Sequence, residues 1–300
     1  MSARPVAFDL QQWSARQLEV IEEALARWVV ADAPAGLGDA MRYAVLDGGK
    51  RLRPLLVLAA CDAVRGNGKA ALRGACAVEL IHAYSLVHDD MPCMDNDVLR
   101  RGKPTVHVAF GEARALLAGD ALQALAFELL APDDEAIPAQ VQAALCRLLA
   151  RAAGHEGMAG GQAIDLASVG MALDEAQLRN MHRRKTGALL RGAVMMGAAC
   201  GTPDRRAAEA LATYGAAVGL AFQVVDDILD VTADSATLGK TAGKDAAHAK
   251  PTYVSLMGLA PSRAYAQALL AQALGALQAS GLADTRGLQA LAIMVVNREN

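Results

Sequence analysis

Two acidic clusters, far apart in the sequence, constrain what this chain can fold into more than any other feature. Each cluster follows an apolar run with helical character, residues 77–87 and residues 220–225. Because a carboxylate buried against an apolar face needs a partner or a metal, we expect the clusters to form two walls of one cavity. An isolated Asp-Asp pair is also typical of a solvated helix end, so further features must decide. The carboxylates are Asp89, Asp90 and Asp95 in the first cluster and Asp226, Asp227 and Asp230 in the second.

The second cluster has the spacing of a shared helix face. Residues three and four positions apart on a helix are neighbours, which places Asp226, Asp227 and Asp230 on one side. Oxygen ligands of this kind suit Mg²⁺, which binds one or two carboxylates together with waters and substrate phosphates. The clusters therefore predict a metal-dependent enzyme that acts on a diphosphate.

The composition favours closely packed helices. Apolar residues make up 54% of the chain but aromatic residues only 4%, so Ala, Leu, Val and Met must build the core. No strand-like alternation of useful length and no linker interrupts the pattern, and we predict one all-α domain over residues 1–300, a single large helical bundle around a central active-site cavity. The predicted helices are 8–30, 37–46, 54–64, 69–90, 111–130, 139–153, 155–167, 174–200, 204–231, 252–259, 262–281 and one that begins at 284.

Charge and cysteine usage limit the partners and the compartment. A net charge of −3 gives no indication of a nucleic-acid partner. The five cysteines are odd in number and lack a C-x-x-C spacing, which is typical of reduced thiols in a cytosolic protein. We find no signal peptide and no run of the roughly 18 apolar residues that a membrane span needs. We therefore expect a cytoplasmic protein without stable membrane insertion.

Basic residues gather in four short segments with phosphate-binding character. Arginine offers a planar fork for two phosphate oxygens, whereas lysine acts as a compact point charge. Each segment taken alone is equally typical of a solvated basic turn. Residues 239–241 lack the strand and the leading glycine of a nucleotide phosphate loop, and the glycines within 157–162 predict a helix kink or close helix packing. The basic segments are residues 48–54, 100–105, 182–187 and 238–250.

Six of these motifs, in this order, resemble those of the trans-prenyl diphosphate synthases, and they are most similar to the bacterial farnesyl diphosphate synthase (geranyltranstransferase) type. The resemblance runs from about residue 37 to residue 258. It implies a homodimer with the isoprenoid synthase fold and an active site in the central cavity of each subunit. The motifs are residues 48–54, 82–95, 100–105, 157–165, 185–187 and 222–230.

The resemblance also implies the metal ligands and the catalytic residues. Three Mg²⁺ ions per active site are expected, with Mn²⁺ as a substitute. Asp89 and Asp95 would hold two of them and Asp226 the third. The remaining carboxylates, Asp90, Asp227 and Asp230, would bind metal-bound waters or support the ligands. The catalytic set implied is Asp89, Asp95, Arg100, Lys185 and Asp226.

Two diphosphate-binding sets follow from the same resemblance, one for each substrate. His82 lies seven residues before Asp89, two helical turns away on the same face, which fits a place beside the site. For the homoallylic substrate, isopentenyl diphosphate, the implied residues are Lys50, Arg53, His82 and Arg101. For the allylic diphosphate they are Arg100, Lys185, Thr186, Gln223, Lys240 and Lys250.

Product length is expected to depend on Tyr84 and Ser85. Tyr84 lies five residues before Asp89, about 7.5 Å along a helix axis. The resemblance implies that an aromatic residue at this position, beside a small neighbour, goes with a fifteen-carbon product. We expect condensation of isopentenyl diphosphate with dimethylallyl and then geranyl diphosphate to give farnesyl diphosphate. Geranyl or geranylgeranyl diphosphate as the main product, and a non-catalytic regulatory subunit, are the alternatives.

Other metal proteins fit less well. A di-iron bundle needs two Glu-x-x-His pairs, and the chain has only the one at residues 79–82. His88-Asp89 suggests a metal phosphohydrolase but has no convincing upstream histidine partner. A terpene cyclase would lack the basic residues 50–53 and 100–101. The tail, residues 292–300, departs from the resemblance because no aromatic residue precedes Arg298.

Overall fold

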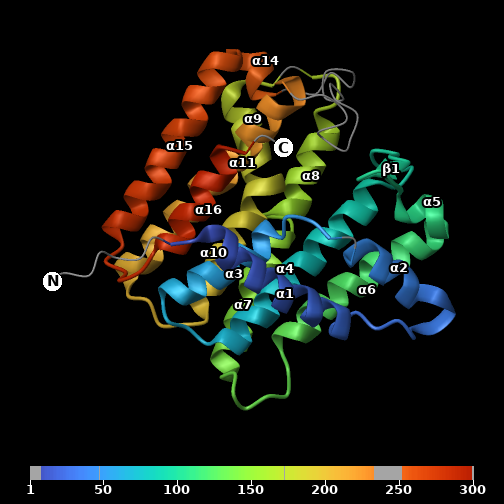
Figure 1. The fold of residues 1–300 in the computed structure, drawn as a ribbon. Coiled ribbons are helices and arrows are strands. Elements are labelled where there is room, and N and C mark those ends of the chain that lie inside the picture. The colour runs from blue at the N-terminus through green and yellow to red at the C-terminus, as the bar shows by residue number, and fades with distance from the viewer. Residues whose placement is uncertain (1–7, 47, 172, 233–251, 299–300) are drawn as a thin grey trace.

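The computed structural model describes residues 8–46, 48–171, 173–232 and 252–298, and these form a bundle of helices (Figure 1). The prediction of an all-α fold is confirmed. In chain order the elements are α1 (Leu10–Trp28), η1 (Pro34–Gly36), α2 (Leu37–Val45), α3 (Leu52–Ala63), α4 (Gly68–Asp89), β1 (Leu99–Arg100), β2 (Lys103–Pro104), α5 (Val106–Phe110), α6 (Glu112–Leu130), α7 (Ala139–Ala153), α8 (Met158–Ala167), α9 (Glu175–His182), η2 (Arg183–Gly187), α10 (Ala188–Ala199), α11 (Arg205–Thr232), α14 (Tyr253–Met257), α15 (Leu259–Ala279) and α16 (Arg286–Val296).

Polar caps set several helix starts. Asp9 accepts a hydrogen bond from the Gln12 backbone at 2.9 Å, which begins α1. Asp174 forms a reciprocal capping box with Gln177 at the start of α9. Each cap satisfies backbone N–H groups that the first helical turn leaves without a partner.

The two helices that precede the acidic clusters are central in the bundle. α4 packs against α3 and α6, and α11 packs against α10 and α15 (Figure 1). Alanines fill much of the interior, including the fully buried Ala75 and Ala77 of α4. Small side chains allow close helix approach, so the low aromatic content is compatible with a dense core.

Two local features differ from the predicted helices. The helix predicted over residues 174–200 contains a π-helical turn, Arg183–Gly187, between α9 and α10. After the first acidic cluster, β1 and β2 form a short antiparallel hairpin that pairs Leu99 with Pro104. Its turn residues Arg101 and Gly102 both have positive φ, 51° and 77°.

The expectation that no segment is long and apolar enough to cross a membrane needs correction. By length and composition, α4 and α11 both reach that threshold. In the hydrophobic windows concerned, 67% of the α4 residues and 50% of the α11 residues are buried inside the structure. Core helices of soluble proteins meet the same criterion, so the finding is weak support for a membrane span.

Candidate active site

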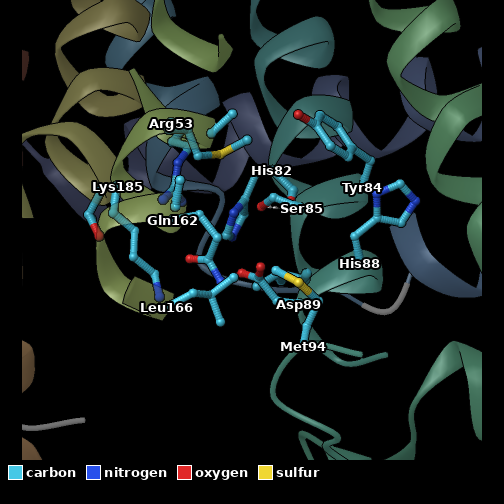
Figure 2. Close-up of a pocket in the computed structure, with 15 residues that line it drawn as sticks. Arg53, His82, Tyr84, Ser85, His88, Asp89, Met94, Gln162, Leu166 and Lys185 are labelled. Carbon is cyan, nitrogen blue, oxygen red and sulfur yellow. Dashed lines mark hydrogen bonds between the residues drawn. The ribbon is translucent and has the colours of Figure 1, made fainter. Parts of the chain in front are cut away.

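A cavity of about 400 Å³, called here the carboxylate cavity, lies between α4 and α8 (Figure 2). Asp89 lines it from the last turn of α4, and Lys185 and Thr186 line it from η2. Figure 2 shows Gln162 and Leu166 of α8 on the side opposite Tyr84 and His88. The remaining lining residues are Arg53, His82, Ser85, Leu86, Met94, Met158, Ala159 and Ala163.

Asp89 is the carboxylate most affected by its surroundings. Burial raises the pKa of Asp89 to about 6 from 3.8; Lys185 opposes this shift and the nearby Asp95 reinforces it. Burial disfavours the ionised form of a carboxylate, and a cation bound beside it stabilises that form. Asp89 therefore has the character of a carboxylate that gains from a cation in the cavity.

Asp90 faces a different partner. The Arg100 guanidinium donates three hydrogen bonds to the buried Asp90 carboxylate, at 2.5 to 3.1 Å. Arg100 lines a separate cavity of about 60 Å³ together with Arg101 and Tyr43, and it does not line the carboxylate cavity. The structure thus brings Asp89 and Lys185 to one cavity, whereas Asp90 and Arg100 line the smaller one and act on Asp89 electrostatically.

The three carboxylates of the second cluster have three different environments. Asp226 accepts a hydrogen bond from Arg298 near the chain end. Asp227 is buried and accepts from Gln223 Nε2 at 2.9 Å and from the Tyr253 backbone at 2.8 Å. Asp230 is buried, and its Oδ1 has no hydrogen-bond partner within the described ranges.

A hydrogen-bonded chain links the second cluster to the carboxylate cavity. Thr186, which lines the cavity, donates to Gln223 Oε1 at 3.0 Å, and Gln223 in turn donates to Asp227. The π-helical turn that carries Thr186 packs closely on α8, because a side chain at Gly161 would lie 2.1 Å from the Lys185 backbone nitrogen. This contact confirms the expected close packing at the glycines of residues 157–162.

A second cavity, of about 740 Å³, is lined by all four residues predicted to hold the homoallylic substrate and is called here the cation cavity. Arg53 and His82 line both cavities, so the two adjoin at these residues. The second acidic cluster is also close, because Asp226 acts electrostatically on Lys50 and Arg53. The cation cavity is lined by Gly49, Lys50, Arg51, Leu52, Arg53, Glu79, His82, Arg101, Phe222, Met294, Val295, Asn297 and Arg298.

The electrostatics of the cation cavity favour an anion. Burial lowers the pKa of Lys50, and Arg298 and Arg101 lower it further. Burial and then the positive charges of Arg53 and Arg101 hold the pKa of His82 well below 6.5, so its imidazole is neutral at neutral pH. Arg53 Nε is buried without a hydrogen-bond partner among the described residues. A bound diphosphate would relieve the repulsion between these cations.

The loop between α2 and α3 is built around Arg51. This residue is 5% exposed and has a φ of 45°, in the left-handed region. Its guanidinium binds Glu22 at 2.7 Å, Glu79 at 2.8 Å and the Val45 carbonyl at 2.7 Å. Arg51 therefore anchors the segment that presents Lys50 and Arg53.

Two glycines let the hairpin reach this loop. Gly48 and Gly49 have positive φ values of 73° and 135°. Arg101 donates to the Gly48 carbonyl at 2.7 Å, and a Cβ at Gly49 would lie only 2.9 Å from the Arg101 guanidinium. The loop and Arg101 thus form one side of the cation cavity.

Several residues beside the cavities were not among the predicted site residues. Gln162 lines the carboxylate cavity, and both polar atoms of its side chain are buried without partners among the described residues. Asp165 pairs with Lys185 at 2.5 Å. Arg298 binds Asp226, and its contact joins segments 72 positions apart. Gln162 and Asp165 lie three residues apart on one helix face, and this spacing could have identified them as site residues. No local spacing connects Arg298 with the site.

The donor chemistry fits Mg²⁺, although no ready-made metal centre is present. Among the residues that the structure describes, no three His, Cys, Asp or Glu side chains could hold a metal ion by themselves. Asp89, with its raised pKa, and Asp230, with its orphaned buried oxygen, are hard oxygen donors that lack a cation. Lys240 and Lys250 lie outside the described residues.

Comparisons with known proteins agree on one family. The chain matches the polyprenyl synthetase family over residues 34–286. The probable farnesyl diphosphate synthase of Bradyrhizobium diazoefficiens is 52% identical over 271 residues, which cover 87% of this chain and 80% of the relative. The chloroplastic heterodimeric geranylgeranyl pyrophosphate synthase large subunit 1 of Arabidopsis thaliana is 44% identical over 304 residues, which cover 99% of this chain and 82% of the relative. A crystal structure of an FPP/GFPP synthase from Zymomonas mobilis is similar with a TM-score of 0.83 and 42% identity, covering 96% of this chain and 98% of the other.

Proposed function

Because this chain belongs to the polyprenyl synthetase family, we propose that it makes farnesyl diphosphate in a Mg²⁺-dependent reaction. Isopentenyl diphosphate condenses first with dimethylallyl diphosphate and then with the geranyl diphosphate formed, releasing one diphosphate at each step. The trans-prenyl synthase activity follows from the family. The fifteen-carbon product, the metal and the assignment of residues are the proposal.

One observation carries the assignment of the two substrates. Arg53 and His82 line both the carboxylate cavity and the cation cavity, so ligands in the two cavities would meet at these residues. A condensation needs its two reacting carbons side by side. We place the allylic diphosphate near Asp89 and Lys185, and isopentenyl diphosphate near Lys50 and Arg53.

The residues of the two cavities divide the work of the reaction. Lys185 and Thr186 would hold the allylic diphosphate and stabilise the negative charge that builds on it as its bond to carbon breaks. Lys50, Arg53 and Arg101 would orient isopentenyl diphosphate, whose double bond attacks the allylic cation. Apolar residues such as Met158 and Leu166 would keep water from that cation.

Asp89, Asp95 and Asp226 are the residues proposed to hold Mg²⁺, with Mn²⁺ as a substitute. When bound, the metal neutralises charge on the departing diphosphate. Asp230, whose buried oxygen lacks a partner among the described residues, is a candidate for supporting metal-bound water. Asp90 and Asp227 would act differently, since one pairs with Arg100 and the other joins Gln223 to α14.

The product length rests on the far end of the carboxylate cavity. Tyr84 lines this cavity, and the small side chain of Ser85 turns back to donate to the His82 carbonyl at 2.8 Å. A bulky ring here would stop the growing chain. A twenty-carbon product is the second candidate, because a relative named as a geranylgeranyl pyrophosphate synthase subunit is 44% identical over nearly the whole chain.

We also propose a cytoplasmic homodimer without nucleic-acid or membrane partners. Both α5 and α6 carry exposed apolar side chains. The two helices pack on each other at one side of the bundle (Figure 1). Leu117 is 56% exposed, and Val108 and Leu116 lie in the same pair of helices. A second copy that covers this face would bury them.

Product chromatography tests the proposal. The protein is incubated with Mg²⁺, dimethylallyl diphosphate and excess isopentenyl diphosphate, and the dephosphorylated alcohols are separated by length. A dominant fifteen-carbon alcohol is expected. A dominant ten- or twenty-carbon alcohol would overturn the length, and release of phosphate without condensation would overturn the reaction.

A further inference from the structure

Tyr84 does not hold its position alone, because its ring rests on a histidine one helical turn further along α4. The rings of Tyr84 and His88 meet edge to face, with centroids 5.6 Å apart and planes at 74°. Both side chains line the carboxylate cavity (Figure 2). Residues four apart on a helix share a face, so the two rings form one continuous surface.

His88 is itself fixed by α6. Its Nε2 lies 3.1 Å from the backbone carbonyl of Leu116, a hydrogen bond that the ring makes as donor. Such a bond restricts the imidazole to one orientation. The position of the Tyr84 ring is therefore tied, through His88, to a helix that contributes no lining residue to this cavity.

Gly119 provides the space that this arrangement needs. A Cβ at position 119 would lie 2.1 Å from His88 Nε2, and the three nearest atoms would all belong to the His88 ring. Glycine in a helix interior costs stability relative to alanine, so its place here has a packing reason. A methyl group at position 119 would therefore meet the His88 ring before any other group.

We propose that His88 and Gly119 are positioning residues that set the product length by holding the Tyr84 ring. The inference rests on the proposed function, because it assumes that the growing prenyl chain ends at Tyr84. His88 acts through Tyr84, and Gly119 acts through His88. Met158 and Leu166 of α8 also line the cavity and supply its opposite apolar wall.

Two substitutions should shift the product length in opposite directions. In Gly119→Ala, the new methyl group displaces the His88 ring from α6 into the cavity, so the product becomes shorter. In His88→Ala, Tyr84 loses its support and moves into the vacated space, so the product becomes longer. Loss of one aromatic contact corresponds to about a fivefold change in the ratio of neighbouring product lengths.

The experiment measures the ten-, fifteen- and twenty-carbon products of both variants, with Tyr84→Ala as the reference for an opened cavity. Gly74→Ala is the matched control, because a Cβ there meets its nearest neighbour at an ordinary 3.5 Å. The control should keep the unmutated distribution. Opposite shifts in the two test variants support the proposal, whereas a loss of yield with an unchanged distribution overturns it.

A binding measurement separates this inference from the proposed function. Isothermal titration calorimetry compares geranyl with farnesyl diphosphate and needs no turnover. Gly119→Ala should weaken farnesyl diphosphate about fivefold relative to geranyl diphosphate, and His88→Ala should not. An unchanged preference in Gly119→Ala overturns the positioning role even if the unmutated protein condenses its substrates. Absence of condensation in the unmutated protein, with the shift in preference intact, overturns the proposed function alone.

Discussion

Arg298 neutralises Asp226, one of the carboxylates that we propose to bind metal. Its Nη2 donates to the Asp226 carboxylate and, at 2.8 Å, to the Phe222 carbonyl. The guanidinium also stacks 4.0 Å from the centroid of the Phe222 ring, and its side chain is 11% exposed. A cation that binds Asp226 would therefore compete with the positive charge of Arg298.

Replacement of Arg298 by glutamine should strengthen metal binding to the free protein. Loss of a partly buried ion pair corresponds to about three- to tenfold in affinity, because the competing charge is removed. Electron paramagnetic resonance titration with Mn²⁺ measures this directly. Arg205→Gln is the control, since Arg205 is almost fully exposed at the other end of α11. Equal Mn²⁺ affinities in the Arg298 variant and the unmutated protein would contradict the prediction.

Asp89→Asn should lower turnover by at least about a hundredfold, since an electrostatic contact to the leaving group is lost. The same substitution should increase the free energy of unfolding at pH 8. The pKa of Asp89 is raised to about 6, so ionisation destabilises the folded protein as the pH rises from 3.8 to 6. The variant should therefore be more stable than the unmutated protein at pH 8, by at most about 3 kcal/mol, with little difference at pH 4.

Urea unfolding at the two pH values tests this stability change, and Asp133→Asn, which changes an exposed residue after the end of α6, serves as control. Metal affinity of the unmutated protein should also fall as the pH drops through about 6, because Asp89 becomes protonated. If the stability difference between Asp89→Asn and the unmutated protein did not change with pH, the pKa of Asp89 would not be raised by burial.

Lys50→Gln and Arg53→Gln should raise KM for isopentenyl diphosphate with a smaller effect on the allylic KM. Each removes a charge-assisted contact to one diphosphate, which corresponds to roughly ten- to a hundredfold. Steady-state kinetics with each substrate varied in turn provides the measurement. Lys69→Gln is the control, because its side chain is 68% exposed and lines neither cavity. A rise confined to the allylic KM would mean that the two substrates bind the other way round.

Arg51→Leu should destabilise the fold. The change leaves Glu79, which is 5% exposed, without its cation, and loss of one partner of a buried ion pair costs about 3 kcal/mol. The free energy of unfolding in urea measures the loss. Arg151→Leu, which removes an exposed pair with Glu156, should cost less than about 1 kcal/mol. Similar costs in the two variants would refute the anchoring role of Arg51.

Leu117→Glu should convert the proposed dimer into monomers, because a charge would be placed within the apolar face of α5 and α6. Light scattering after size-exclusion chromatography gives the mass of each variant. Val20→Glu is a control, since Val20 is also exposed but lies on α1. A dimer of unchanged affinity in Leu117→Glu would place the interface elsewhere.

The helices could be predicted because apolar residues recur with helical period, and one predicted helix coincides with α7 (Ala139–Ala153). The hairpin could not, since two-residue strands such as Leu99–Arg100 show no alternation. The residue types of the site were readable from their spacing. Their partners were not: Asp165 is 20 positions from Lys185, and Arg298 is 72 from Asp226. Such contacts depend on tertiary packing, which local patterns do not record.

The π-helical turn Arg183–Gly187 makes the chain between α9 and α10 sensitive to a change in its length. Such a turn is one residue longer than the α-helical turn it replaces, so it shifts the screw phase between α9 and α10. Leu178 can thereby pack beside Tyr253 while Leu190 packs in the main core. Deletion of a single residue would restore a straight helix and rotate one half against the other by about 100°. Lys185 would then leave the cavity, so this segment should not tolerate the deletion of a residue.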